Sequence, residues 1–204
     1  MEAEAQHNAK RIGVLLAAGR GRRMGQAKQL LPWPSTGGSK PLVAAAFDSI
    51  ASVCRHMVVV LGHEAEAVAA ALGSRKFHRE VSDPDAEMFV STCAGLQAAQ
   101  QIDSAADVLL HPGDHPAVQT NTLDALIRVS GNHPESAIMP VYLGNGGHPV
   151  LIPAGLVDPI LSYDGNGGLR QFWRAYPTTC LRLVVSDPSV VQDLDTPSDY
   201  GPST

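Results

Sequence analysis

The sequence is poor in cysteine and has no long apolar run. Its 204 residues include three cysteines, Cys54, Cys93 and Cys180, which lie far apart and form no CxxC pair. This spacing indicates neither a disulfide framework nor a zinc site, and it favours a reducing, cytoplasmic environment. A membrane-spanning helix needs about 20 consecutive apolar residues, and no window of the sequence approaches that length. We therefore expect no membrane partner.

Acidic residues are missing from one stretch near the amino terminus. Between Ala5 and Phe47 there is no Asp or Glu but seven Lys or Arg, whereas the rest of the chain holds all 20 acids and eight basic residues. The net charge is nevertheless -5. An acidic chain that gathers its cations around one glycine-rich segment indicates a local anion site and not a polyanion surface, so nucleic acid is not an expected partner.

Apolar runs of strand length alternate with helical patterns along the chain. The expected strands are 12–16, 57–61, 108–110, 137–142, 150–152 and 181–185, and the expected helices are 41–53, 64–72, 91–102, 120–129, 153–161 and 168–176. This alternation predicts an α/β fold with a mostly parallel sheet flanked by helices. With 44% hydrophobic residues and no linker, we expect one domain over 1–204, with 1–10 as a flexible tail.

Two further expectations concern the connections. Ser39 should open the helix 41–53, with Pro41 in its first turn. The segments 33–39 and 163–168 are rich in glycine and serine, and we expect them to be loops at the edges of a cleft.

The glycine-rich basic segment follows the first expected strand. It departs from the dinucleotide fingerprint GxGxxG, which needs glycine where Met24 stands, and from the Walker A pattern, which needs Lys-Ser or Lys-Thr where Gln26-Ala27 stands. Backbone N–H groups around its glycines can still approach an anion, with Arg23 and Lys28 reaching the same charge. The alternative is a solvated turn with incidental arginines.

Downstream residues favour the phosphate-binding interpretation. Residues 16–32, which read LAAGxGxRMGxxKxLLP, resemble the signature of the MobA-like nucleotidyltransferases, a family that includes enzymes adding CMP or GMP to the molybdenum pterin cofactor. Further similar segments are KPL at 40–42, MFVSTCAGL at 88–96, GDHP at 113–116, GHP at 147–149, GGLR at 167–170 and DLDTPSDY at 193–200. The chain departs from the family pattern at Ser39 and Glu87, where glycine is expected, and in the lengthened turn 33–38.

The resemblance implies a single Rossmann-like, glycosyltransferase-A-like nucleotidyltransferase domain that uses Mg²⁺. It implies that catalysis depends on Arg23, Lys28 and Asp114. The implied nucleotide-binding residues are Leu16, Ala17, Ala18, Gly19, Gly21, Arg23, Lys28, Ser91, Thr92 and Gly95. Ser91 and Thr92 would contact the base or ribose, or else cap the helix expected to begin there.

Asp114 is the main candidate metal ligand. It follows an apolar strand, in a turn where an α/β sheet presents its carboxyl ends to a ligand, and a carboxylate there can hold Mg²⁺ against phosphates. The alternative is a structural turn cap. Asp193 and Asp195 are candidates for a second carboxylate, with Asp195 slightly favoured, and either could instead cap a following helix. His111 and His115 lie close to Asp114 in the sequence, so a transition-metal site is an alternative. The use of Mg²⁺ by the family that the chain resembles disfavours it.

The acceptor side is less defined. His148 and Arg170 are candidates to line it, although His148 could equally be a packed histidine that fixes a turn. The Ala17-Ala18 pair resembles the motif of the family's cytidylyltransferases, and its extra methyl group narrows the space beside the base, which favours CTP.

The expected activity is therefore transfer of an NMP, with CMP favoured, from an NTP to a small phosphorylated acceptor such as the molybdopterin cofactor, with release of pyrophosphate. Docking to a molybdoenzyme or its chaperone would follow from that role. Two alternatives remain: a nucleotide- or flavin-binding redox protein on the same fold, and a non-catalytic protein that delivers a cofactor.

Overall fold

The centre of the molecule is an eight-stranded mixed sheet in a computed structural model that describes residues 11–19, 27–164 and 166–192. Its strands are β1 (Arg11–Ala17), β4 (His56–Leu61), β5 (His78–Val81), β6 (Asp107–Pro112), β7 (Ala137–Tyr142), β8 (Asn145–Gly146), β9 (Val150–Ile152) and β10 (Cys180–Val184). The order is β10-β7-β9-β6-β1-β4-β5, with β8 paired to β7. The pairs β1–β4, β1–β6, β4–β5 and β7–β10 are parallel, whereas β9 runs antiparallel to β6 and β7. The expected single α/β domain with a mostly parallel sheet is confirmed.

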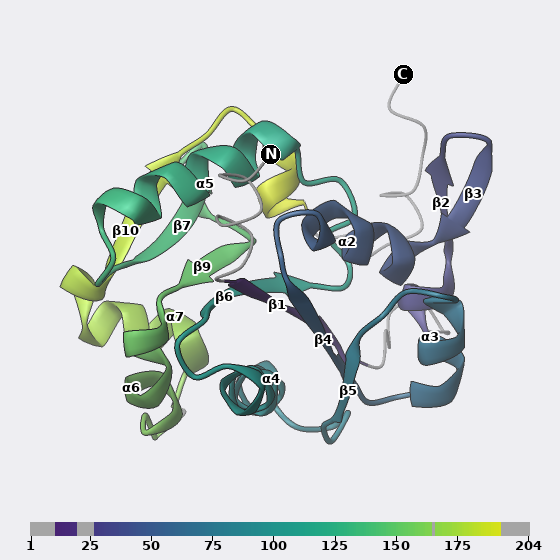
Figure 1. The fold of residues 1–204 in the computed structure, drawn as a ribbon, viewed down its shortest axis with the longest axis horizontal. Coiled ribbons are helices and arrows are strands. Elements are labelled where there is room, and N and C mark those ends of the chain that lie inside the picture. Colours follow the sequence, from purple (N-terminus) through teal and green to yellow (C-terminus); the bar gives the residue numbers. More distant parts are fainter. Residues whose placement is uncertain (1–10, 20–26, 165, 193–204) are drawn as a thin grey trace.

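Helices cover both faces of this sheet (Figure 1). They are α2 (Leu42–Ala51), α3 (Ala65–Ala71), α4 (Met88–Ile102), α5 (Thr120–Asn132), α6 (Val157–Leu161) and α7 (Gly168–Ala175), with short 3₁₀ turns η2 (Lys28–Leu30), η3 (Ala154–Leu156), η4 (Pro177–Thr179) and η5 (Pro188–Val191). One core cluster joins the sheet to α2, α3 and α5, and the other joins it to α4, α6 and α7. The described part of the chain contains no helix that is both long enough and apolar enough to cross a bilayer.

Strand β1 shows why the central strands are continuously apolar. Successive side chains of a strand point to opposite faces, so Leu15 and Ala17 enter the first cluster while Ile12 and Val14 enter the second. Leu15 and Val14 are completely buried. Each such side chain contributes about 1.5–3 kcal/mol relative to remaining exposed. The paired burial anchors the carboxyl end of β1, from which the glycine-rich segment departs.

The segment 33–39 is not a loop, which corrects the sequence prediction. β2 (Pro32–Ser35) and β3 (Gly38–Pro41) pair as an antiparallel hairpin that projects beside α2 (Figure 1). Its turn includes Gly37 and Gly38 with φ of 86° and 147°, a region that glycine adopts without the steric cost of a Cβ. Ser39 therefore lies in a strand, and α2 begins at Leu42 after an N-cap Pro41 that gives no side-chain cap.

Other boundaries also differ from expectation. Helix α4 begins at Met88, three residues before Ser91, and the segment expected to be one helix over 153–161 is divided into η3 and α6. β5 was not expected, because its sequence HREV has no apolar run. In the segment 163–168, Tyr163 Oη donates to the Asn166 carbonyl at 3.0 Å, which ties this connection to itself.

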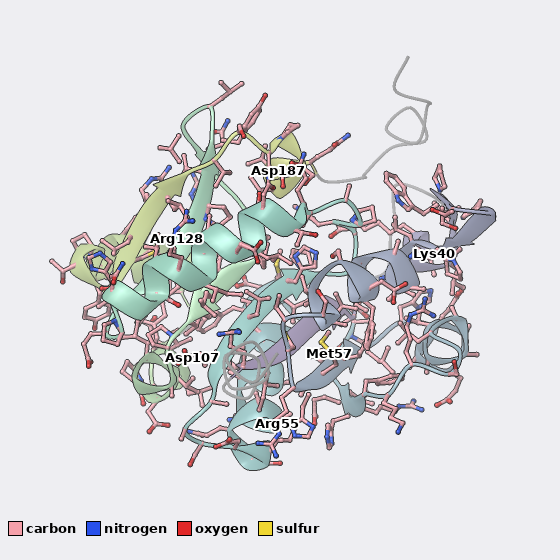
Figure 2. All side chains as sticks on the ribbon, turned by 45° about the horizontal axis from the view of Figure 1, so that its top comes forward. Lys40, Arg55, Met57, Asp107, Arg128 and Asp187 are labelled. Carbon is pink, nitrogen blue, oxygen red and sulfur yellow. The ribbon has the colours of Figure 1, made fainter. Side chains whose placement is uncertain are left out.

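Asp187 fixes the last described 3₁₀ turn to the sheet's helical cover (Figure 2). Its side chain is 1% exposed. It accepts hydrogen bonds from the Gln119 N–H at 3.0 Å and the Thr122 hydroxyl at 2.9 Å, and from both the N–H and the hydroxyl of Ser189. A buried carboxylate is tolerated only when its oxygens are satisfied in this way, so Asp187 is a structural carboxylate that joins η5 to the start of α5.

Candidate active site

A cavity of about 230 Å³ opens at the carboxyl ends of β1 and β6. It is lined by Leu16, Ala18 and Gly19 after β1, Lys28 and Gln29 of η2, Asp83, Pro84, Ala86, Met88 and Ser91 around the start of α4, and Pro112, Gly113 and Asp114 after β6. Parallel strands bring their carboxyl ends to one edge, which is where open α/β sheets bind ligands. Segments from three distant parts of the sequence therefore meet in one concave site.

Close backbone contact joins the segments that follow β1 and β6. The Gly113 N–H donates to the Leu16 carbonyl at 2.8 Å. A Cβ at position 113 would lie 3.0 Å from that same oxygen and 3.4 Å from the Ala17 Cβ. Glycine at this position lets the turn that carries Asp114 pack directly against the end of β1.

Gln29 holds η2 against the same strand end. Its side chain is 3% exposed, and its Nε2 donates to the carbonyls of Ala17 at 3.2 Å and Gly19 at 2.7 Å. Ala17 is the last residue of β1 and Gly19 lies two residues beyond it, so the amide of Gln29 ties η2 to the end of this strand. Gln29 was not identified from the sequence. The available signal was an amide side chain among apolar and basic residues.

The side chains of Lys28 and Asp114 form an ion pair inside the cavity, between Lys28 Nζ and Asp114 Oδ2. They are 15% and 19% exposed, respectively, so water screens the pair less than it would at the surface. Gln29 positions Lys28 from one side, and the turn after β6 positions Asp114 from the other. The arrangement places one cation and one carboxylate side by side in the cavity.

Three imidazole rings pack in series on the far side of the Asp114 turn. The His115 ring lies edge-to-face with His111 at a centroid distance of 5.9 Å and with His148 at 5.7 Å. His115 Nε2 is 4.0 Å from Asp114 Oδ1. Burial lowers the pKa of His111 well below its usual value, and nearby His115 adds to that effect. His111 is therefore kept neutral in the folded protein.

Residues 13–180 match the MobA-like NTP transferase domain. The chain belongs to this family. The MobA-like assignment covers both the glycine-rich segment after β1 and the turn that carries Asp114.

Two curated relatives of different activity align with nearly the whole chain. Nicotine blue oxidoreductase of Paenarthrobacter nicotinovorans is 33% identical over 193 residues, which covers 90% of this chain and 91% of the relative. Molybdenum cofactor cytidylyltransferase of Escherichia coli K12 is 22% identical over 187 residues, with 92% of each chain covered. Proteins similar to nearly the whole chain are therefore named for different activities.

Solved structures show the same architecture. Rv0371c from Mycobacterium tuberculosis H37Rv has a TM-score of 0.78 and 27% identity over 94% of this chain and 95% of that one. A complex of Rv0371c with manganese has also been solved, with a TM-score of 0.71, 27% identity and coverage of 94% and 96%. A nucleotidyl transferase from Methanothermobacter has a TM-score of 0.73 and 25% identity, with 94% of each chain covered. Family and neighbours together support a nucleotidyltransferase.

The structure brings six of the residues expected at the site to one cavity: Leu16, Ala18, Gly19, Lys28, Ser91 and Asp114. Ala17 is buried in the core and takes part through its carbonyl. Gly21, Arg23, Asp193 and Asp195 lie outside the described residues. His148 packs on His115, and exposed Arg170 lies in α7 and does not line the cavity.

Two of the expected nucleotide contacts are interior residues. Gly95 lies in α4 on the side that packs against the sheet, and a Cβ there would come within 2.4 Å of Val14 Cγ1. Thr92 is 2% exposed, and its hydroxyl donates to the Met88 carbonyl at 3.0 Å. Neither Ser91 nor Thr92 caps α4, because the helix begins one turn earlier; Ser91 instead donates to the Ser82 hydroxyl at 3.0 Å.

The donor set at Asp114 fits a hard divalent cation held partly by substrate. Mg²⁺ keeps several waters and binds one or two carboxylates together with phosphate oxygens, and Asp114 supplies such a carboxylate. Within the described ranges, no group of three or more His, Cys, Asp or Glu side chains could hold a metal ion. The chemistry available here matches a metal that arrives with a nucleotide better than a closed protein cage.

Proposed function

We propose that this chain is a Mg²⁺-dependent nucleotidyltransferase that moves an NMP, preferably CMP, from an NTP to a small phosphorylated acceptor and releases pyrophosphate. The observation that supports it most strongly is the meeting of Lys28 with Asp114 in the cavity beside the glycine-rich segment. A cation and a metal-binding carboxylate at one strand edge are the two charges that a triphosphate requires.

Asp114 would hold Mg²⁺, which supplies charge neutralisation on the phosphates when bound. Lys28 would leave Asp114 for the phosphates, and Arg23 and the backbone amides after β1 would stabilise the charge on the departing pyrophosphate. An acceptor phosphate oxygen attacks the α-phosphorus, a new P–O bond forms, and the bond to the bridging oxygen breaks. The protein supplies no nucleophile, since positioning and charge stabilisation promote such transfers. The manganese complex of Rv0371c supports a divalent ion.

The preference for CTP rests on the wall after β1. Ala18 is 5% exposed, and its backbone is in close contact with the segment after β4: a Cβ at Gly62 would lie 2.5 Å from the Ala18 carbonyl. The strand end therefore has little freedom to move away from a larger base. Ser91, at the opposite wall, presents a hydroxyl that can bind the base or ribose. The similarity to a molybdenum cofactor cytidylyltransferase favours molybdopterin as the acceptor.

The remaining parts of the proposal concern the acceptor side. His148 and Arg170 would contact the acceptor, and Asp195 or Asp193 would give a second carboxylate. A cytoplasmic location and docking to a molybdoenzyme or its chaperone would complete the role.

A nucleotide panel tests this proposal. Thermal stability is measured with CTP, GTP, ATP and UTP, each with and without Mg²⁺, and pyrophosphate release is then measured with the molybdopterin cofactor. A ligand at 100 times its Kd adds about 2.7 kcal/mol of stability. We expect the largest shift with CTP and Mg²⁺, and pyrophosphate release that requires the acceptor. Stabilisation by CTP without any pyrophosphate would favour a delivery protein instead.

One observation supports a second function. The relative that is 33% identical over 90% of this chain and 91% of its own is named an oxidoreductase, so a redox activity is assigned to a protein of similar sequence. Under this alternative the purified protein would bind a flavin or oxidise NADH in the presence of an electron acceptor, and it would consume no CTP. Absence of flavin absorbance and of NADH oxidation, together with pyrophosphate release, would exclude it.

A further inference from the structure

Backbone hydrogen bonds of different length flank Asp114 in its turn. Before Asp114, the Gly113 N–H is fixed to the Leu16 carbonyl at 2.8 Å. After Asp114, the His115 N–H donates to the Pro112 carbonyl over a longer distance of 3.4 Å. A hydrogen bond of this length is weak, and a shorter bond from another group holds the downstream half of the turn more firmly.

His111 supplies that group. Its Nε2 lies 2.7 Å from the His115 carbonyl oxygen, and the side chain is completely buried on β6. The bond joins residues four positions apart and closes a ring that includes Asp114. A short bond inside the protein holds its partners more firmly than one exposed to water.

The chemistry of this bond fixes the form of the imidazole. A carbonyl only accepts hydrogen bonds, so Nε2 must carry the proton and Nδ1 must be bare when the ring is neutral. His111 Nδ1 is buried and has no hydrogen-bond partner among the described residues, which fits a nitrogen without a proton. Burial and the neighbouring His115 both lower the pKa of His111, so the required neutral ring persists.

The His115 ring completes the support. It is 3% exposed and lies between the rings of His111 and His148, at centroid distances of 5.9 and 5.7 Å. His148 is itself fixed by its N–H, which donates to the Val190 carbonyl at 2.8 Å. The downstream half of the turn is thus held through both its carbonyl and its ring, while the Asp114 carboxylate faces Lys28.

We propose that His111 is a positioning residue for Asp114: its Nε2–H bond to the His115 carbonyl holds the turn so that the carboxylate stays directed into the cavity. His111 is not among the residues that line that cavity, so it acts through the turn and not on a ligand. The consequence for metal affinity rests on the proposed function; the consequence for the order of the turn does not.

Two substitutions separate the hydrogen bond from packing. His111→Gln keeps an N–H donor, whereas His111→Leu fills similar space without one. Leu109→Ala is the control, because Leu109 lies two residues earlier on the same face of β6 and is 1% exposed, so its truncation destabilises the strand without touching the turn. Each protein is first checked for folding by chemical denaturation.

Two readouts are then taken: amide hydrogen exchange of residues 112–117, and Mn²⁺ binding without nucleotide. For His111→Leu we expect faster exchange in this turn and Mn²⁺ affinity lower by about 10- to 100-fold, the loss typical when support behind a metal ligand is removed. His111→Gln should restore both to near the wild-type values. Leu109→Ala should lower the denaturation midpoint and change neither.

Unchanged exchange in His111→Leu, or the same change in Leu109→Ala at matched stability, would overturn the inference. If the wild type binds no Mn²⁺, the metal-dependent function fails, while the exchange data still decide the role of His111. If His111→Leu does not fold, NMR of the wild type decides: a slowly exchanging imidazole proton on His111 Nε2 supports the proposal, and a proton on Nδ1 overturns it.

Discussion

Lys28 and Asp114 are 86 positions apart in the sequence, yet their side chains form an ion pair in the cavity at the ends of β1 and β6. The pair means that the carboxylate proposed to bind a cation already has one in contact. A divalent ion must compete with Lys28, and an arriving phosphate can draw Lys28 away. Lys28 should therefore weaken metal binding by Asp114 in the absence of nucleotide, and it should support turnover when nucleotide is bound.

Lys28→Met should separate these effects. Without the ammonium group, Asp114 should bind Mn²⁺ more tightly in the absence of nucleotide, by about tenfold if the competition is worth roughly 1.4 kcal/mol. Turnover with CTP should fall by about 10²-fold or more, because the positive charge that stabilises the leaving pyrophosphate is lost. Calorimetric titration and a pyrophosphate assay measure the two quantities.

The control for this experiment is Lys40→Met. Lys40 pairs with Asp48 Oδ2 at 2.8 Å near the β2–β3 hairpin, where Figure 2 labels it, and it does not line the cavity. Neither Mn²⁺ affinity nor turnover should change in this variant. Weaker Mn²⁺ binding in Lys28→Met would show that Lys28 supports the ion and does not compete with it.

Gly95→Ala should reduce stability and leave nucleotide affinity unchanged. The new methyl group would come within 2.4 Å of Val14 Cγ1 and 3.0 Å of Val60 Cγ2, and overpacking of this kind costs about 1–3 kcal/mol. Gly131→Ala in α5 is the matched control, since a Cβ there meets nothing within 4 Å. Urea denaturation and CTP titration of both variants test this. A large loss of CTP affinity in a folded Gly95→Ala protein would contradict this prediction and support Gly95 as a nucleotide contact.

Asp187→Ala should destabilise the protein by about 3 kcal/mol, because four hydrogen bonds to one buried carboxylate are lost and their donors remain. Asp158→Ala is the comparison: this carboxylate accepts an exposed bond from Gln100 Nε2 at 2.7 Å, and its loss should change stability by only about 0.5 kcal/mol. Equal denaturation midpoints for the two variants would contradict the structural role of Asp187.

Acid should destabilise the fold through His111. The folded pKa of His111 is depressed by burial, so below the ordinary histidine value of about 6.5 the unfolded chain binds a proton that the folded protein does not. Stability from this group should therefore fall by up to about 1.4 kcal/mol per pH unit, from pH 6.5 down to the folded pKa. The rings of His115 and His148 pack in the same cluster as His111.

The measurement is the free energy of unfolding between pH 8 and 5. His111→Gln should flatten the slope below pH 6.5, since glutamine does not titrate. An identical slope in the wild type and in His111→Gln would assign the acid sensitivity to other groups.

The sequence was informative where one physical constraint dominates. β7 and β9 begin and end where their apolar runs do, because strands buried on both faces have no polar side to blur the pattern. The meeting of Lys28 and Asp114 also followed from sequence, since both come after strands whose carboxyl ends share an edge.

Other features depend on contacts that a local pattern does not encode. The β2–β3 hairpin has the composition of a loop. It forms two strands because its two halves pair with each other, with Trp33 opposite Lys40. Gly95 belongs to a family signature, but glycine there also serves helix-to-sheet packing, and only the position of Val14 decides between the two. Gln29 was missed because its partners are backbone carbonyls, which every sequence contains.

The most direct test of the account is pyrophosphate release from CTP and Mg²⁺ by wild type and by Asp114→Asn, which keeps the shape of the side chain and removes its charge. With the molybdopterin cofactor present, the wild type should release pyrophosphate and the variant should do so at least about 10²-fold more slowly. Equal rates in the two folded proteins would contradict the claim that Asp114 and Lys28 act on one triphosphate.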